Sequence, residues 1–136
     1  PTVSTGLVRY TKSVAVSASS SKVDLITFSQ SGYLMTVSGK IHIIFNDVNY
    51  ASGTQSIIAN IVGHCDQGMS NLPNDYNVVD TASASNGGIS ITTSVTSSKT
   101  AGSANGELKI QITTGSSTGG TAYIIFEGLM YQGSIS

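Results

Sequence analysis

The tripeptide His64-Cys65-Asp66 is the one place in the chain where three chemically reactive side-chain types are adjacent. Neighbouring side chains of an extended chain point to opposite faces, so His64 and Cys65 are not placed to form a thiolate–imidazole pair. A zinc site would need more ligands, and the chain has only one Cys and two His, the other being His42. The sequence therefore predicts a buried cysteine flanked by polar loop residues, with no metal and no cofactor.

Acidic side chains give no stronger catalytic signal. Asp66, Asp75 and Asp80 lie in a stretch rich in Gly and Asn, and their spacing matches no EF-hand loop, so we interpret them as turn residues. Spacing alone leaves a glycosidase-type carboxylate pair open, but the chain has only seven acidic residues. The glycine-rich segment 115–120 lacks the lysine of a phosphate-binding loop. Without a paired nucleophile and base, the sequence predicts no enzyme.

Two tyrosines indicate a different chemistry. Tyr50 and Tyr76 lie in polar segments beside Asn and Asp, a combination that can bind sugars by stacking and hydrogen bonding. The alternative is that both rings fold back over the edge of the core with their hydroxyl groups in water. We take two segments as candidate receptor contacts, and their residues are Asn49, Tyr50, Asn74, Asp75, Tyr76 and Asn77.

The composition indicates which elements must position these residues. Charged residues make up 10% of the 136-residue chain and hydrophobic residues 39%, while Ser and Thr supply roughly a quarter. A polar surface built from Ser and Thr suits pleated strands. The net charge of −1 gives no basic surface for nucleic acid, and no uninterrupted apolar run is long enough to insert into a membrane.

Alternation of apolar and polar residues predicts about eight strands and no helix. The expected strands are residues 7–18, 23–29, 33–37, 40–48, 55–63, 89–96, 108–114 and 120–131. Ser38-Gly39 is expected to separate two of them. The stretch 64–88 is expected to be irregular, with at most a short strand at 76–79. This spacing predicts an all-β antiparallel sandwich, jelly-roll-like, in a single domain at 7–136 after a lead-in at 1–6.

Two of the expected strands are apolar on both faces. In the last strand, one face carries Ala122, Ile124, Phe126 and Met130, and the opposite face is also apolar. Ile41, Ile43 and Phe45 share one face of the earlier strand. A sandwich covers only one face of each sheet, so something else must cover the other. We expect sister subunits there, in contact with His42, Ile44, Tyr123, Ile125, Leu129 and Tyr131.

Three segments carry a resemblance to a known family. The closing stretch 123–131, Gly32-Tyr33-Leu34 followed by residues 40–43, and Gly106-Glu107-Leu108-Lys109-Ile110 resemble the globular heads of the complement and tumour-necrosis-factor type. The chain is poorer in aromatic and charged residues than those heads and lacks their collagen stalk. Its Ser-, Thr- and Gly-rich texture is more similar to the heads of bacteriophage tail fibres and tailspikes. The resemblance implies a threefold homotrimer with central strands around the axis.

Residues and resemblance together predict a viral fibre or spike head on the outside of the virion. As a homotrimer it would attach to a host-surface receptor, with a glycan expected before a protein. One alternative is a non-enzymatic trimerisation or capping domain of a fibre. Another is a monomeric carbohydrate-binding module, although the absence of Trp argues against it. Pro1 in place of an initiating Met is expected from a fragment of a longer chain.

Overall fold

The computed structural model describes residues 5–31, 34–47, 53–66, 76–86, 91–98, 105–115 and 119–136. These residues form nine strands: β1 (Thr5–Val16), β2 (Val23–Ser29), β3 (Leu34–Asp47), β4 (Gly53–Asp66), β5 (Tyr76–Asn86), β6 (Ile91–Ser98), β7 (Glu107–Thr114), β8 (Gly120–Tyr131) and β9 (Ser134–Ile135). Across those ranges the chain contains no helix long and apolar enough to cross a lipid bilayer.

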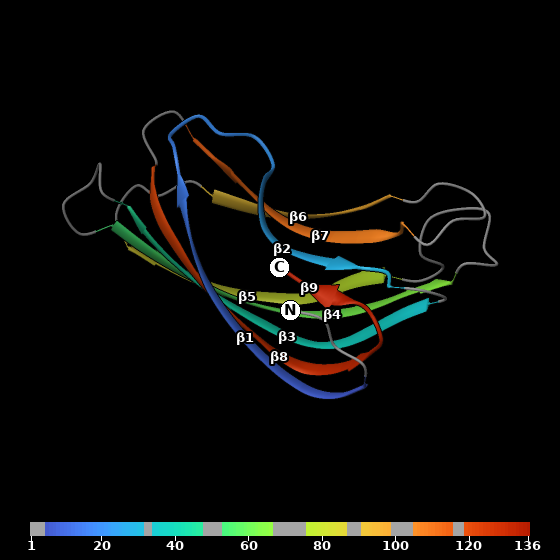
Figure 1. Ribbon diagram of the computed structural model, residues 1–136. Coiled ribbons are helices and arrows are strands. Elements are labelled where there is room, and N and C mark those ends of the chain that lie inside the picture. The colour runs from blue at the N-terminus through green and yellow to red at the C-terminus, as the bar shows by residue number, and fades with distance from the viewer. Residues whose placement is uncertain are drawn as a thin grey trace.

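The strands form two antiparallel sheets (Figure 1). One sheet has the order β1-β8-β3-β4-β5, and the other has the order β6-β7-β2-β9. The first strand pairs with the eighth and the second with the seventh, which is the nested pairing of a jelly roll. The meander β3-β4-β5 then extends one sheet instead of crossing to the other. The predicted all-β, jelly-roll-like sandwich is confirmed.

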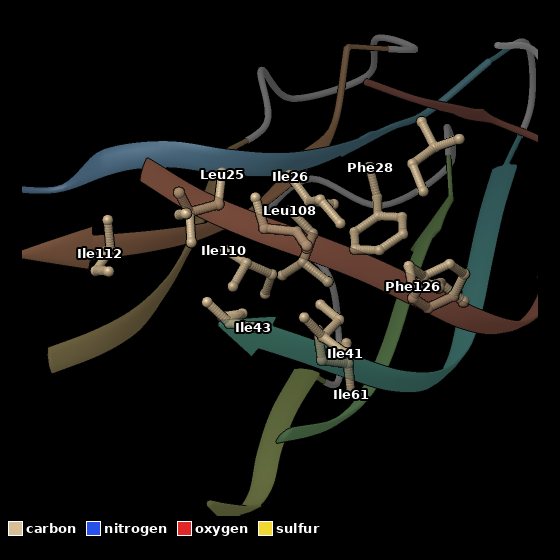
Figure 2. Packing of buried hydrophobic residues seen from close by; sticks show 14 of the residues in the cluster. Leu25, Ile26, Phe28, Ile41, Ile43, Ile61, Leu108, Ile110, Ile112 and Phe126 are labelled. Atoms are coloured by element: carbon tan, nitrogen blue, oxygen red, sulfur yellow. The ribbon is translucent and has the colours of Figure 1, made fainter. Parts of the chain in front are cut away.

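Side chains from the facing sheets meet in one hydrophobic core (Figure 2). Leu108, Ile110 and Ile112 of β7 lie opposite Ile41 and Ile43 of β3, and all are buried. The rings of Phe28 and Phe126 join the sheets in an edge-to-face contact, with their centroids 5.0 Å apart. The core face predicted for the last strand is confirmed, because Ala122, Ile124, Phe126 and Met130 are all buried.

The predicted break at Ser38-Gly39 is wrong, because β3 is one continuous strand from Leu34 to Asp47. Gly39 pairs directly with Gly128 of β8. A Cβ atom on Gly39 would lie 2.7 Å from Phe126 Cε1, and one on Gly128 would lie 2.9 Å from Phe126 Cζ. The two glycines therefore leave the space on the core face that the phenylalanine ring occupies, and they do so without ending either strand.

The predicted irregularity of 64–88 is wrong at both ends. β4 continues to Asp66, so His64 and Cys65 lie in a strand and not in a loop. β5 is an eleven-residue strand that pairs with β4 along its length, with a register shift between Ala59 and Asn60. Its sequence YNVVDTASASN has little apolar alternation, so its strand character comes from pairing with β4 and not from local propensity.

Candidate interaction surface

The two sheets differ sharply on their outward faces. Large apolar side chains that are exposed in the described part of the chain all belong to the β1-β8-β3-β4-β5 sheet, and they are Leu7, Ile44, Ile58, Val62, Tyr123, Leu129 and Tyr131. The side chains of the residues that alternate with them along the same strands point into the core. We call this outward surface of β1, β8, β3 and β4 the outer face. An exposed apolar surface concentrated on one sheet is typical of an interaction site.

Strand register arranges the outer face in rows that run across the strands. Leu7 pairs with Leu129, which pairs with Ser38, and Ser38 pairs with Val62. The next row, two residues further along each strand, contains Arg9, Glu127, Lys40 and Asn60. The third row contains Thr11, Ile125, His42 and Ile58, and the fourth contains Ser13, Tyr123, Ile44 and Ser56. A polar row therefore crosses a surface that is otherwise mainly apolar.

We call Arg9, Glu127 and Lys40 the charged row. The Glu127 carboxylate lies between two partners, with Oε2 4.0 Å from Arg9 Nε and Oε1 3.7 Å from His42 Nε2. These contacts are long, and the side chains of Arg9 and Glu127 are 68% and 53% exposed. Lys40 is exposed and takes part in no ion pair with the described residues. Such exposed pairs contribute little to the stability of a single chain.

A shallow depression of about 480 Å³ adjoins the charged row. Its lining includes Ile44, Tyr123, Ile125 and His42 of β3 and β8 and the small residues Thr11 and Ser13 of β1. The depression exists because these small residues stand beside large ones on the neighbouring strands. It could accept an apolar side chain or ring from a partner.

On the β6-β7-β2-β9 sheet, the described outward side chains of β2 and β7 are mainly polar. The Gln111 amide donates a hydrogen bond to Asp24 Oδ1 at 2.7 Å, and Lys109 Nζ donates to Asp24 Oδ2 at 3.1 Å. The bond from Gln111 is the largest effect that holds the pKa of Asp24 below its usual value, while partial burial acts in the opposite direction. Hydrogen bonding to Asp24 in turn raises the pKa of Lys109.

The side chains of His64 and Cys65 lie on opposite faces of β4. Cys65 is fully buried, as predicted, and its thiol donates to Gln30 Oε1 at 3.0 Å. His64 is on the opposite side, where its Nδ1 lies 2.8 Å from Thr36 Oγ1. The two reactive groups are therefore not a pair. No cluster of three or more potential metal ligands is present within the described ranges.

The six residues predicted for a subunit interface all lie on the outer face. Tyr123, Leu129 and Tyr131 are 51%, 57% and 48% exposed, and Ile44 is 52% exposed. His42 and Ile125 are half-buried beside them. Sequence reasoning did not include Leu7, Ile58, Val62 or the charged row in this surface. The parity of Ile58 and Val62 within their strand was the available signal, whereas the charged row depends on register between strands.

Most of the predicted receptor contacts are not placed by the structure. Asn49, Tyr50, Asn74 and Asp75 lie outside the described residues. Tyr76 and Asn77 were expected in a loop, but they begin β5 and pair with Gly63 and Val62. Segment 48–52 connects to Gly53 at the start of β4, and segment 67–75 follows Asp66 at its end.

Comparison with known proteins supports the fold. No protein-family model and no curated protein matches the sequence. The structure is similar to the tailspike protein of the Acinetobacter phage vB_ApiP_P1, with a TM-score of 0.51 and 18% sequence identity. The similarity covers 90% of this chain but only 22% of the tailspike chain. The two proteins share a fold over this length.

Proposed function

We propose that the chain is a β-sandwich head of a viral tail fibre or tailspike that attaches the virion to a host-surface receptor, as a homotrimer. The observation that carries the proposal is the outer face, where the described residues include seven large apolar side chains exposed on one sheet. Covering this face with sister subunits removes apolar surface from water, at roughly 25 cal/mol per Å². The fold shared with a tailspike supports a place in a virion tail.

Three copies would also strengthen attachment. A glycan receptor is repeated on a cell surface, so three weak sites on one particle bind far more tightly than one. The outer face is used for assembly in this proposal, so receptor contacts belong elsewhere on the molecule. Asn49 and Tyr50 before β4, and Asn74 to Asn77 before and at the start of β5, remain our candidates.

The test is binding of the fluorescently labelled chain to a panel of bacterial cells that includes Acinetobacter strains, with parallel assays on a glycan array. We expect binding to a subset of strains and loss of binding after the surface polysaccharide is removed. Tyr50→Ala and Tyr76→Ala test the two candidate segments separately, because one segment precedes β4 in the chain and the other follows it. The matched change Tyr10→Phe, on a half-buried tyrosine of β1, should leave binding unchanged.

A second candidate function rests on the same outer face. A trimerisation or capping domain would assemble through it and contact no receptor. An assembled chain that binds no cell and no glycan would favour this function. A chain that stays monomeric yet binds glycans would instead favour a carbohydrate-binding module.

A further inference from the structure

The charged row lies inside the apolar surface and not at its margin. The row of Leu7, Leu129, Ser38 and Val62 lies on one side of it, and the row of Thr11, Ile125, His42 and Ile58, in which two of the four side chains are apolar, lies on the other. Any partner that covers both of these rows must also cover Arg9, Glu127 and Lys40. Burying an unpaired charge is energetically costly, so the partner has to present opposite charges against the charged row.

A second copy of the chain meets this requirement. The charged row contains both signs, with Glu127 on β8 and Lys40 directly across from it on β3. A rotation axis parallel to β3 and β8 places each row of one copy against the same row of the next. Apolar rows then meet apolar rows, and the Glu127 carboxylate of one copy can approach the Lys40 ammonium of its neighbour. Lys40 has no competing ion pair among the described residues.

A slip along the strands would break this match. Moving one copy by two residues would set the charged row against the row of Leu7, Leu129, Ser38 and Val62 or against the row of Thr11, Ile125, His42 and Ile58. Neither row contains an acidic side chain, so Arg9 and Lys40 would be buried without an opposite charge. A polar layer within an apolar interface is an established means of fixing register, at some cost in stability.

We infer that the outer face binds further copies of the chain, and that ion pairs between Lys40 of one copy and Glu127 of the next fix the register of the assembly. This inference rests on the proposed function for the assembly itself but not for the receptor. Beyond that function, the inference adds the ion pairs between copies that select one arrangement of the assembly.

The test uses charge reversal and mixing. Lys40→Glu gives a chain with an acidic row, and Glu127→Lys gives a chain with a basic row. Each variant alone should assemble at least about tenfold more weakly than the parent, because like charges meet between copies. An equimolar mixture should recover assembly in part, since a mixed trimer has two contacts between an acidic and a basic row and one contact between like charges. Native mass spectrometry with one variant isotopically labelled detects the mixed species directly.

Mixing separates contacts between copies from contacts within one chain, because neither variant can restore an internal pair in the other. Lys22→Glu, which reverses an exposed lysine in the turn before β2, is the matched control and should assemble as the parent does. Circular dichroism of each variant confirms the fold before mixing.

Single variants that assemble like the parent, or a mixture that recovers nothing, would overturn the ion-pair assignment. A parent chain that is monomeric at all concentrations would overturn the inference completely. Neither result depends on receptor binding. The cell and glycan assays can therefore fail while this inference stands, and the reverse also holds.

Discussion

At the scale of single residues, Gly106 shows how closely the strand ends are packed. Its N–H group donates to Gln30 Oε1 at 3.2 Å, and its carbonyl accepts from the Gln30 N–H at 2.7 Å. The same Gln30 oxygen accepts from the Cys65 thiol. A Cβ atom at position 106 would overlap Cys65 Sγ. The glycine is therefore required by space, which the sequence signals only as part of an Asn-Gly turn.

We expect Gly106→Ala to lower the free energy of unfolding by about 2 kcal/mol, because the new methyl group has no room. Cys65→Ala removes the sulfur atom that it would meet, so the double variant should lose less than the sum of the two single losses. Urea unfolding of the parent, both single variants and the double variant measures this coupling. Losses that simply add would show that the clash with the cysteine is relieved by other movements.

Asp24 should make stability depend on pH. Its pKa is lower in the folded chain than the value of about 3.9 for a free aspartate, so folding favours the charged form. The resulting stabilisation is present above the unfolded pKa and is lost as pH falls through the folded pKa. Because the Asp24 side chain is 45% exposed, solvent screening keeps the effect below about 1 kcal/mol.

The corresponding experiment compares Asp24→Asn with the parent by urea unfolding from pH 7 to pH 2. We expect the parent to be the more stable of the two at pH 7 and the difference to shrink as the pH falls below about 4. A difference that stays constant over this range would mean that the carboxylate charge contributes nothing.

At the scale of strands, alternation in the sequence predicted which face of β3 and of β8 is buried. It could not predict that Ser38-Gly39 continues β3, because this depends on Gly128 lying opposite Gly39. It also missed β5, whose polar sequence becomes a strand by pairing with β4. The residues predicted for a subunit interface follow from strand parity and from the apolar character of most of them, whereas the charged row depends on the register of three strands. The local sequence pattern therefore predicts which face of a strand is buried. The alignment of side chains in rows across several strands depends on pairing between distant segments.

The link between β1 and β2 depends on Thr114 at the end of β7. Its buried hydroxyl donates to the Ser17 carbonyl at 2.8 Å and accepts from the Ser20 N–H at 3.0 Å. Thr114→Val keeps the shape but leaves both backbone groups without this partner, so we expect a loss of about 1–3 kcal/mol.

Thr113→Val is the matched control for this change. The Thr113 hydroxyl accepts one exposed hydrogen bond, from the Lys22 N–H at 3.2 Å, and water can replace it. Thermal unfolding should therefore show a much larger decrease in Tm for Thr114→Val than for Thr113→Val. Equal decreases would indicate that the loss reflects strand propensity and not the bonds to the turn.

At the scale of the whole molecule, the sandwich has one polar and one apolar outward surface. Asp24, Lys109 and Gln111 form a hydrogen-bonded cluster on the outward side of β2 and β7, so these described side chains are satisfied without a partner molecule. On the outer face of the other sheet, Leu129 lies between Leu7 and Ser38. Because of this asymmetry, an introduced charged side chain should prevent assembly when it lies on the outer face and should have no effect on assembly when it lies on the polar sheet.

Leu129→Asp tests that difference. Leu129 is 57% exposed in the single chain, so the change removes no core contact and should leave the circular dichroism spectrum unchanged. In an assembly it would bury an unpaired carboxylate, so we expect the mass from light scattering to fall from about three times 14.0 kDa to that of one chain. Thr27→Asp, on the polar sheet beside Lys109, should leave the mass unchanged.

If both variants kept the mass of the assembled parent, the outer face would not be the surface that joins the copies. If both became monomeric, added charge alone would explain the loss, and the asymmetry of the two sheets would have no role in assembly.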